Sequence, residues 1–305
     1  MVIGPKPAVH AGAPSPVLAG IGLMLVGVLM FSFGDALGKF LVATYSVGQL
    51  LLLRACAALL LLSPLIWRRR ADFIRLERPW LQLLRAVLST LEVAAFFLAV
   101  VYLPLADVIT CYLASPIFVT ALSAMFLRER VGWRRWSAVV AGFCGVVIAL
   151  QPSAQTVSWP ALIALGGSLS FAVLMLLTRL LRATPDIVLA SSQFIGTLAF
   201  GIVLAPFGWV PPSLHGLGLF MAAGWISVCA LICVNRSLKL APASSVVPYQ
   251  YSMIIWAVIL GYLVFGNLPS MATLVGAAII IAAGLYIFLR EQALGRDEAA
   301  VTPPV

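Results

Sequence analysis

Charged side chains inside apolar stretches are the residues of this chain best able to do chemistry. If these stretches span a bilayer, a charge at the centre costs about 2.5–3.5 kcal/mol, so it needs a partner, a ligand or a proton. Asp35 and Lys39 stand four residues apart in one apolar run, and Arg85 and Glu92 stand seven apart in another. Each spacing puts the two side chains on one helical face, and Asp35 and Lys39 within reach of each other.

Two further ionisable residues, Arg54 and Asp107, lie one to two turns inside the second run and at the start of the fourth. By depth we place both of them with Asp35 and Lys39 toward the outer side, and Glu92 near the midplane. The predicted charge cluster comprises Lys39, Arg54, Arg85 and Asp107. Asp35 and Glu92 are the candidates for binding a proton or a substrate ammonium. The alternative is that internal ion pairs lock the helices together while Lys39 and Arg54 extend to the interface.

Polar and aromatic residues beside two prolines form a second candidate set. They are Tyr112, Ser115 and Pro116 in the fourth run, and Pro248, Tyr249, Gln250 and Tyr251 in the ninth. Each proline removes a backbone hydrogen bond and frees carbonyl groups that can face a cavity. Tyrosine rings pack against flat apolar groups and still donate a hydrogen bond. We expect this set to line a substrate cavity, with the prolines as kinking or gating points, unless the prolines merely bend helices around the core.

The composition defines the class of protein that must position these residues. The chain has 305 residues, of which 63% are hydrophobic and 10% are charged, and its mean hydropathy is +1.10. Soluble domains carry about 25% charged residues. In lipid, backbone groups must be satisfied within helices or a closed barrel, and these runs have the length of helices without the alternation of barrel strands. The sequence therefore predicts an all-α, polytopic membrane protein.

The apolar runs number ten. They cover residues 18–38, 47–66, 80–101, 105–126, 133–150, 158–178, 187–206, 215–235, 244–264 and 270–289. Residues 1–17 are predicted to be a disordered leader, and residues 290–305 a short tail.

The basic residues test this number of crossings. With ten crossings, every group of flanking cations falls on one side: Lys6; Arg68, Arg69, Arg70, Arg75 and Arg78; Arg128, Arg130, Arg134 and Arg135; Arg179 and Arg182; Arg236 and Lys239; Arg290 and Arg296. The alternate connections contain no Lys or Arg: 41–46, 102–104, 151–157, 207–214 and 265–269. By the positive-inside rule both termini are predicted to be cytoplasmic, in a cell inner membrane. The net charge of +9 then reports orientation and not binding to nucleic acid.

Two halves of the chain resemble each other. At an offset of 138 residues, Pro104 aligns with Pro242 and Val108 with Val246. Five runs precede the connection at 151–157 and five follow it, so an odd number of crossings turns the second half upside down. The sequence therefore predicts inverted five-helix repeats at 18–150 and 158–289, an arrangement that lets two halves rock about a site between them.

The segment A-D-V-I-T-C-Y-L-A-S-P-I-F…F-L-R-E-R resembles the EamA-type branch of the drug/metabolite transporter superfamily. Its most specific part is Pro116 followed thirteen residues later by Glu129. The chain departs from the family pattern at Arg128, where glycine is usual. In the second half, Ile254 and Asn267 stand where the proline and the acid would fall.

This resemblance implies a transporter of small polar metabolites, often amino acids, and not an enzyme. It also implies a cavity lined by the first, third, fourth, sixth, eighth and ninth helices, with the fifth and tenth as scaffold. Export of hydrophobic or aromatic amino acids is the first choice, because the aromatic amino-acid exporters are the nearest subgroup. Uptake of a nucleoside-like or sulfonium metabolite or drug is one alternative, and a non-transporting membrane scaffold or enzyme is another.

No feature of the sequence indicates a cofactor or a metal site. There is no phosphate-binding loop, and the two histidines, His10 and His215, lie in the leader and at the edge of a run. Cys229 and Cys233 are four apart but have no third ligand nearby in the sequence. The expected partners are the lipid bilayer, a small-molecule substrate and a coupled proton, and the oligomeric state stays open.

Overall fold

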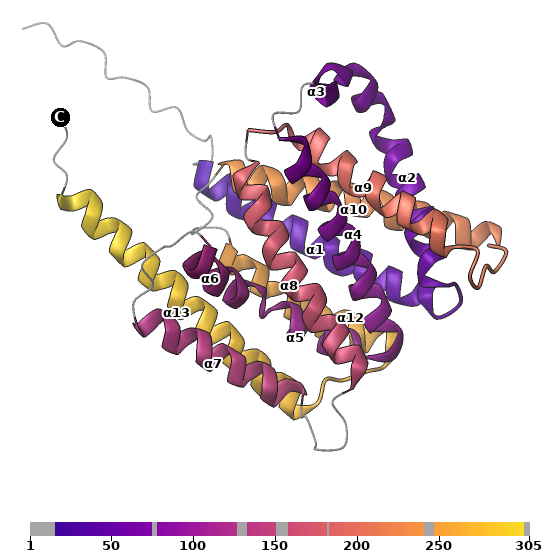
Figure 1. The fold of residues 1–305 in the computed structure, drawn as a ribbon. Helices are drawn as coiled ribbons and strands as arrows, with labels where there is room; N and C mark the ends of the chain where they lie inside the picture. Colours follow the sequence, from indigo (N-terminus) through magenta and orange to yellow (C-terminus); the bar gives the residue numbers. More distant parts are fainter. Residues whose placement is uncertain are drawn as a thin grey trace, which may run out of the picture.

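The computed structural model describes residues 16–74, 78–126, 133–150, 158–181, 183–240 and 247–301. Throughout these residues the regular elements are helices, which confirms the all-α class (Figure 1). All but the last two residues of the predicted leader lie outside the described residues, as does Glu129.

The first half of the chain forms seven of these helices. They are α1 (Pro16–Val42), α2 (Val47–Arg68), α3 (Arg70–Ile74), α4 (Pro79–Tyr102), α5 (Leu105–Tyr112), α6 (Ser115–Phe126) and α7 (Trp133–Leu150). The start of α2 is capped by Ser46, whose hydroxyl oxygen accepts a hydrogen bond from the Gln49 amide at 3.2 Å. The short helix α3 was not predicted.

The second half repeats the succession of helices without a counterpart of α3. It contains α8 (Trp159–Leu180), α9 (Asp186–Leu204), α10 (Leu214–Leu240), the 3-10 helix η1 (Val247–Ser252), α12 (Met253–Phe265) and α13 (Met271–Val301). Gly266 ends α12 with φ +67°, a left-handed conformation that glycine adopts without the cost of a Cβ. Helix α13 continues through most of the predicted tail, as far as Val301.

Among the described residues, six helices are long and apolar enough to cross a membrane: α1, α2, α4, α8, α9 and α10. Four shorter apolar helical segments lie at 105–119, 136–149, 249–265 and 271–286, in the fourth, fifth, ninth and tenth predicted runs. The chain is therefore a multi-pass membrane protein. The ten-crossing arrangement stays a prediction.

The fourth predicted run is not one continuous helix. Helix α5 ends at Tyr112, two residues of turn follow, and α6 begins at Ser115 with Pro116 as its second residue. Proline has no amide hydrogen, so it cannot donate to the carbonyl four residues earlier, and the first turn of a helix accommodates it without the loss of a hydrogen bond. The ninth run is also irregular, because Pro248 lies in the 3-10 turn that precedes α12.

Close helix pairs join the two halves, and glycine makes the contacts possible. The principal pairs are α1 with α10, α2 with α9, α4 with α8, and α7 with α13, and α5 also packs on α12. A Cβ on Gly201 of α9 would lie 2.6 Å from the backbone nitrogen of Leu52, and one on Gly48 would lie 2.6 Å from the backbone carbon of Leu204. These two contacts run in opposite chain directions, so α2 and α9 are antiparallel.

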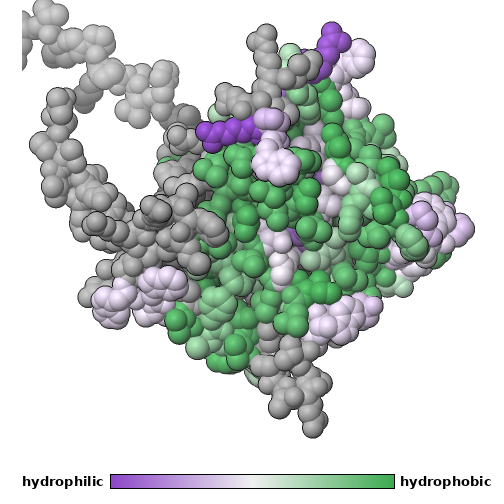
Figure 2. Space-filling view, viewed as in Figure 1, coloured by the Kyte–Doolittle hydropathy of each residue, from purple (hydrophilic) through white to green (hydrophobic). Residues whose placement is uncertain are grey.

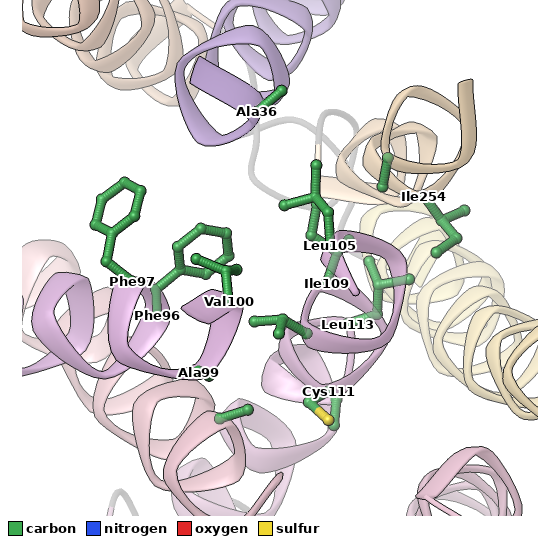
Figure 3. Packing of buried hydrophobic residues seen from close by; sticks show 14 of the residues in the cluster. Ala36, Phe96, Phe97, Ala99, Val100, Leu105, Ile109, Cys111, Leu113 and Ile254 are labelled. Carbon is green, nitrogen blue, oxygen red and sulfur yellow. The ribbon is translucent and has the colours of Figure 1, made fainter. Parts of the chain in front are cut away.

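Apolar side chains fill the centre of the bundle and also cover its outside. The largest buried cluster draws residues from both halves of the chain, and Figure 3 shows part of it, with Phe97 of α4 and Leu105 and Ile109 of α5. The outer surface carries many exposed large hydrophobic residues, such as Leu60 and Leu263, and hydrophobic colour covers most of the face in Figure 2. A soluble monomer does not expose apolar surface on this scale, so we assign the outer surface to lipid contact.

In Figure 1 the start of α1 and the end of α13 lie toward the same side of the bundle, and α7 and α13 run together along one margin.

Candidate functional site

Arg54 is the charged residue around which the candidate site is built. It lies in the second turn of α2, and only 7% of its surface is exposed. Its Nε donates a hydrogen bond to the Ser227 hydroxyl of α10 at 2.8 Å, and its guanidinium lies 5.0 Å from the ring centroid of Phe97. Its Nη1 is buried and has no hydrogen-bond partner. One nitrogen of the Arg54 guanidinium is thus held by a hydrogen bond, while another can still donate to a ligand.

Two carboxylates lie close to Arg54. Asp35 of α1, which is 8% exposed, and Glu92 of α4 both interact electrostatically with Arg54, and Glu92 also with Asp35. No described residue donates a hydrogen bond to either carboxylate. The Tyr112 hydroxyl completes the group by donating to the Glu92 backbone carbonyl at 3.0 Å. Three helices of the first half therefore bring one guanidinium and two carboxyl groups into one region, with no hydrogen bond between them among the described residues.

A narrow pocket opens beside Arg54. About 330 Å³ of empty space, which includes the part open to the outside, lies between five helices. The lining residues are Phe31, Arg54, Ala55, Val93, Gln193, Phe194, Thr197, Ser227 and Leu231. Most of them lie near the middle of their helix, so the pocket sits at mid-depth in the bundle. Its walls come from α1, α2, α4, α9 and α10, which are the first, second, third, seventh and eighth predicted runs. The family resemblance implied a cavity lined by the first, third, fourth, sixth, eighth and ninth runs.

Lys39 and Asp107 belong to a separate group and do not extend the site at Arg54. The Lys39 ammonium donates to the Leu103 backbone carbonyl at 2.7 Å, and not to Asp35. Asp107 accepts a hydrogen bond from the Thr273 hydroxyl at 2.9 Å and interacts electrostatically with Lys39. Asp35 and Lys39 were expected to lie on one face within reach of each other, but the long lysine side chain donates to the free carbonyl at the end of α4 instead.

Arg85 is also separate from Glu92, despite the seven-residue spacing. Its Nε donates to the Thr178 hydroxyl of α8 at 2.9 Å, and its Nη1 donates to the Leu189 carbonyl of α9 at 2.9 Å. With 2% of its surface exposed, Arg85 joins three helices through neutral hydrogen-bond acceptors and not through an ion pair. The residues of the expected charge cluster thus lie in three separate groups: Arg54, Lys39 with Asp107, and Arg85.

The remaining candidates lie away from the pocket. Tyr251 packs in the apolar core, with its ring against Gly284 of α13 and no partner for its buried hydroxyl. Tyr249 is 37% exposed and Gln250 is half-buried, and neither lines the pocket. Ser115 is buried at the start of α6. The prolines Pro116 and Pro248 begin the helical segments that contain these residues, as described above.

Sequence reasoning missed the uncharged polar residues of the site. Gln193 and Thr197 of α9 and Ser227 of α10 line the pocket, but a lone polar residue in an apolar run gives little signal. Gln49 was also missed: it is fully buried, and its side-chain amide both donates to the Val210 carbonyl at 2.7 Å and accepts from the Val210 amide at 3.1 Å. A search for polar residues at equivalent depths in both halves would have been the only available signal.

The comparisons with known proteins agree with this architecture. The model of the EamA-like transporter family matches residues 18–151 and again 158–289. The chain belongs to this family, and is therefore a transporter by family. A solved crystal structure resembles it with a TM-score of 0.65 at 16% identity, over 90% of this chain and 98% of that one, a likeness that concerns the fold alone.

Several named transporters are similar over nearly their whole length. An S-adenosylmethionine uptake transporter of Rickettsia felis is 25% identical over 90% of this chain and 94% of its own. A riboflavin transporter of Rhizobium johnstonii is 29% identical over 98% and 97%. A pseudopaline exporter of Pseudomonas aeruginosa is 26% identical over 87% and 94%. These relatives include both uptake and export proteins.

Proposed function

We propose that this protein is a secondary transporter that moves a small, positively charged metabolite across the inner membrane through a site between its two halves. The observation that carries the proposal is the buried group of Asp35, Arg54 and Glu92, in which neither carboxylate accepts a hydrogen bond from a described residue and Arg54 Nη1 has no acceptor among them. Charges left unpaired inside a membrane protein are costly, and they mark substrate or proton pathways.

The helix pairing supports two inverted five-helix repeats at 18–150 and 158–289. In such repeats the helices of the first half correspond in order to those of the second: α1 to α8, α2 to α9, α4 to α10, α5 to α12 and α7 to α13. The contact of α1 with α10 then corresponds to the contact of α8 with α4. The other three pairs join each helix to its own counterpart. Such reciprocity is what a two-fold relation between halves produces. Ten crossings with both ends cytoplasmic agree with the family match to each half and with the one-sided basic residues.

The site favours a cationic substrate over an aromatic amino acid. With both carboxylates ionised, the formal charges of Asp35, Glu92 and Arg54 leave one net negative charge. The aromatic pocket expected from Tyr249 and Tyr251 does not form beside this group. Uptake of a sulfonium metabolite, the alternative held from the sequence, is therefore the preferred reading, and the named S-adenosylmethionine uptake relatives support it. Export of hydrophobic or aromatic amino acids becomes the second choice.

The test is transport into proteoliposomes. Labelled S-adenosylmethionine, tyrosine and riboflavin are offered separately, with and without a pH gradient, to the parent protein and to Glu92→Gln. We expect saturable flux of the sulfonium compound, reduced at least ten-fold by the substitution, and faster flux where the gradient drives a coupled proton. Ser89→Ala is the control, because the Ser89 hydroxyl bonds only within α4 to the Ala86 carbonyl.

Two results would contradict the proposal. Riboflavin, which carries no cationic group, as the sole transported compound would overturn the role of the carboxylates. No flux of any compound in vesicles that contain folded protein would favour the scaffold alternative.

A further inference from the structure

We infer that Arg54 and the pocket beside it form a subsite for the carboxylate of a zwitterionic metabolite, and that Gln193 adds a second contact. This inference deepens the proposed function and rests on it. The proposed function assigns the cationic part of the substrate to Asp35 and Glu92. The subsite assigns its anionic part to helices α2, α9 and α10.

The orientation of Arg54 is fixed before any ligand arrives. Ser227 accepts the Nε hydrogen bond while its own hydroxyl donates to the Ala223 carbonyl at 2.6 Å, so its one proton is already committed. The ring of Phe97 lies over the guanidinium on another side. A guanidinium held in this way loses little conformational freedom on binding.

The free donors point to an anion. Arg54 Nη1 is buried without an acceptor in a residue that is 7% exposed and lines the pocket. Gln193 lines the same pocket from α9, and its side-chain amide has no partner among the described residues. The Thr197 hydroxyl is already donated to the Gln193 backbone carbonyl at 2.9 Å. Arginine and amide donors on two facing helices suit the two oxygens of a carboxylate.

The surroundings select a carboxylate that belongs to a zwitterion. Asp35 and Glu92 lie within electrostatic reach of Arg54, so a dianion such as phosphate would be repelled. A ligand that carries an ammonium or sulfonium near its carboxylate satisfies both signs of charge at once. The narrow pocket has room for one such small group beside Arg54.

The experiment measures equilibrium binding to the purified full-length protein in detergent micelles. Two matched ligand pairs are used: S-adenosylmethionine with its decarboxylated form, and tyrosine with tyramine. The parent protein is expected to bind the carboxylate member of a pair at least ten-fold more tightly, as expected for one charge-assisted contact. Arg54→Gln should reduce that preference to roughly two-fold or less, since the charged donor is lost.

A second variant covers the case in which Arg54→Gln does not fold. Gln193→Leu keeps the charge of the site and should weaken the carboxylate ligand several-fold while leaving its decarboxylated partner unchanged. Ser192→Ala, on the neighbouring position of α9 and outside the pocket lining, is the control and should bind both members like the parent.

The result that would overturn the subsite is equal binding of both members of each pair by the parent, or no binding of either carboxylate compound. The subsite would also be overturned if the Gln193→Leu and Arg54→Gln single variants both kept the parent's preference for the carboxylate ligand. Flux without carboxylate preference removes the subsite but keeps the proposed transporter. Carboxylate preference without flux keeps the subsite and removes the proposed transport.

Discussion

Two buried arginines, Arg85 and Arg54, lie in the same bundle and differ in how their donors are used. Arg85 is 2% exposed and donates to Thr178 and to the Leu189 carbonyl, so it ties α4 to α8 and α9. Arg54 is 7% exposed and donates to Ser227, while its Nη1 has no acceptor. Burial alone therefore does not separate a structural arginine from one proposed to bind substrate. The use of each donor does.

The acidic residues divide in the same way. Asp107 accepts a hydrogen bond from Thr273, next to a lysine that is itself bonded to the end of α4. Asp35 and Glu92 accept no hydrogen bond from any described residue. We expect substitutions of Lys39, Arg85 or Asp107, whose side chains are hydrogen-bonded, to lower stability. We expect substitutions in the open group, which comprises Asp35, Arg54 and Glu92, to lower transport.

The largest expected effect on stability is that of Arg85→Met. The substitution removes two charge-assisted hydrogen bonds and leaves the Leu189 carbonyl with the Ser192 hydroxyl as its remaining side-chain donor, so we expect a loss of about 3–5 kcal/mol. Thermal unfolding of the detergent-solubilised protein, followed by tryptophan fluorescence, measures it. Leu83→Ala on the same helix, at a position 54% exposed, is the control and should change little. An unchanged melting temperature for Arg85→Met would mean that the hydrogen bonds of Arg85 do not stabilise the fold, and the comparison with Arg54 would fail.

Gly224→Ala tests the packing that holds Arg54 in place. A Cβ on Gly224 of α10 would lie 2.5 Å from the Arg54 backbone carbonyl, so the helices must separate, at a cost of about 1–3 kcal/mol. Gly218 of the same helix has nothing within 4 Å of its position, and Gly218→Ala should be neutral or slightly stabilising. The same melting assay compares the two. Equal melting temperatures would mean that the α2–α10 contact is looser than described.

Lys39→Met is expected to have a moderate effect. It removes one hydrogen bond to the Leu103 carbonyl from a half-buried side chain, which corresponds to about 1–2 kcal/mol. Transport per folded molecule should remain near that of the parent, because Lys39 lies outside the open group. A loss of transport at unchanged stability would move Lys39 into the site.

Asp35→Asn should lower transport at least ten-fold and change stability by less than about 1 kcal/mol. In the described part of the chain the carboxylate has no hydrogen-bond donor to lose, and removing a buried charge relieves its desolvation. Proteoliposome flux and the melting temperature are measured on the same preparation. Strong destabilisation would show that Asp35 is a structural partner of Arg54.

The smallest effect is expected for Tyr251→Phe. The hydroxyl is buried without a partner, so its removal should leave stability unchanged or raise it by up to about 1 kcal/mol, and should leave transport unchanged. A loss of transport in this variant would restore the aromatic pocket that the sequence predicted in the ninth helix.

Sequence by itself determined the class of this protein and the residues worth testing. A chain made of long apolar runs cannot bury them all in a water-soluble fold, so composition was sufficient to predict a helical membrane protein. The motif around Pro116 was sufficient to suggest the family. The positions of Asp35, Arg54 and Glu92 were visible because charges stand out against an apolar background.

Only the tertiary structure decided which charges meet. A one-dimensional spacing gives the face of one helix but not the identity of the helix opposite, so Lys39 bonds to Leu103 and not to Asp35, and Arg85 bonds to α8 and α9 and not to Glu92. The pocket residues Gln193 and Ser227 are separated from Arg54 by more than a hundred positions. They come together only because α2, α9 and α10 pack side by side, a contact that depends on glycines and small residues whose partners no local pattern specifies.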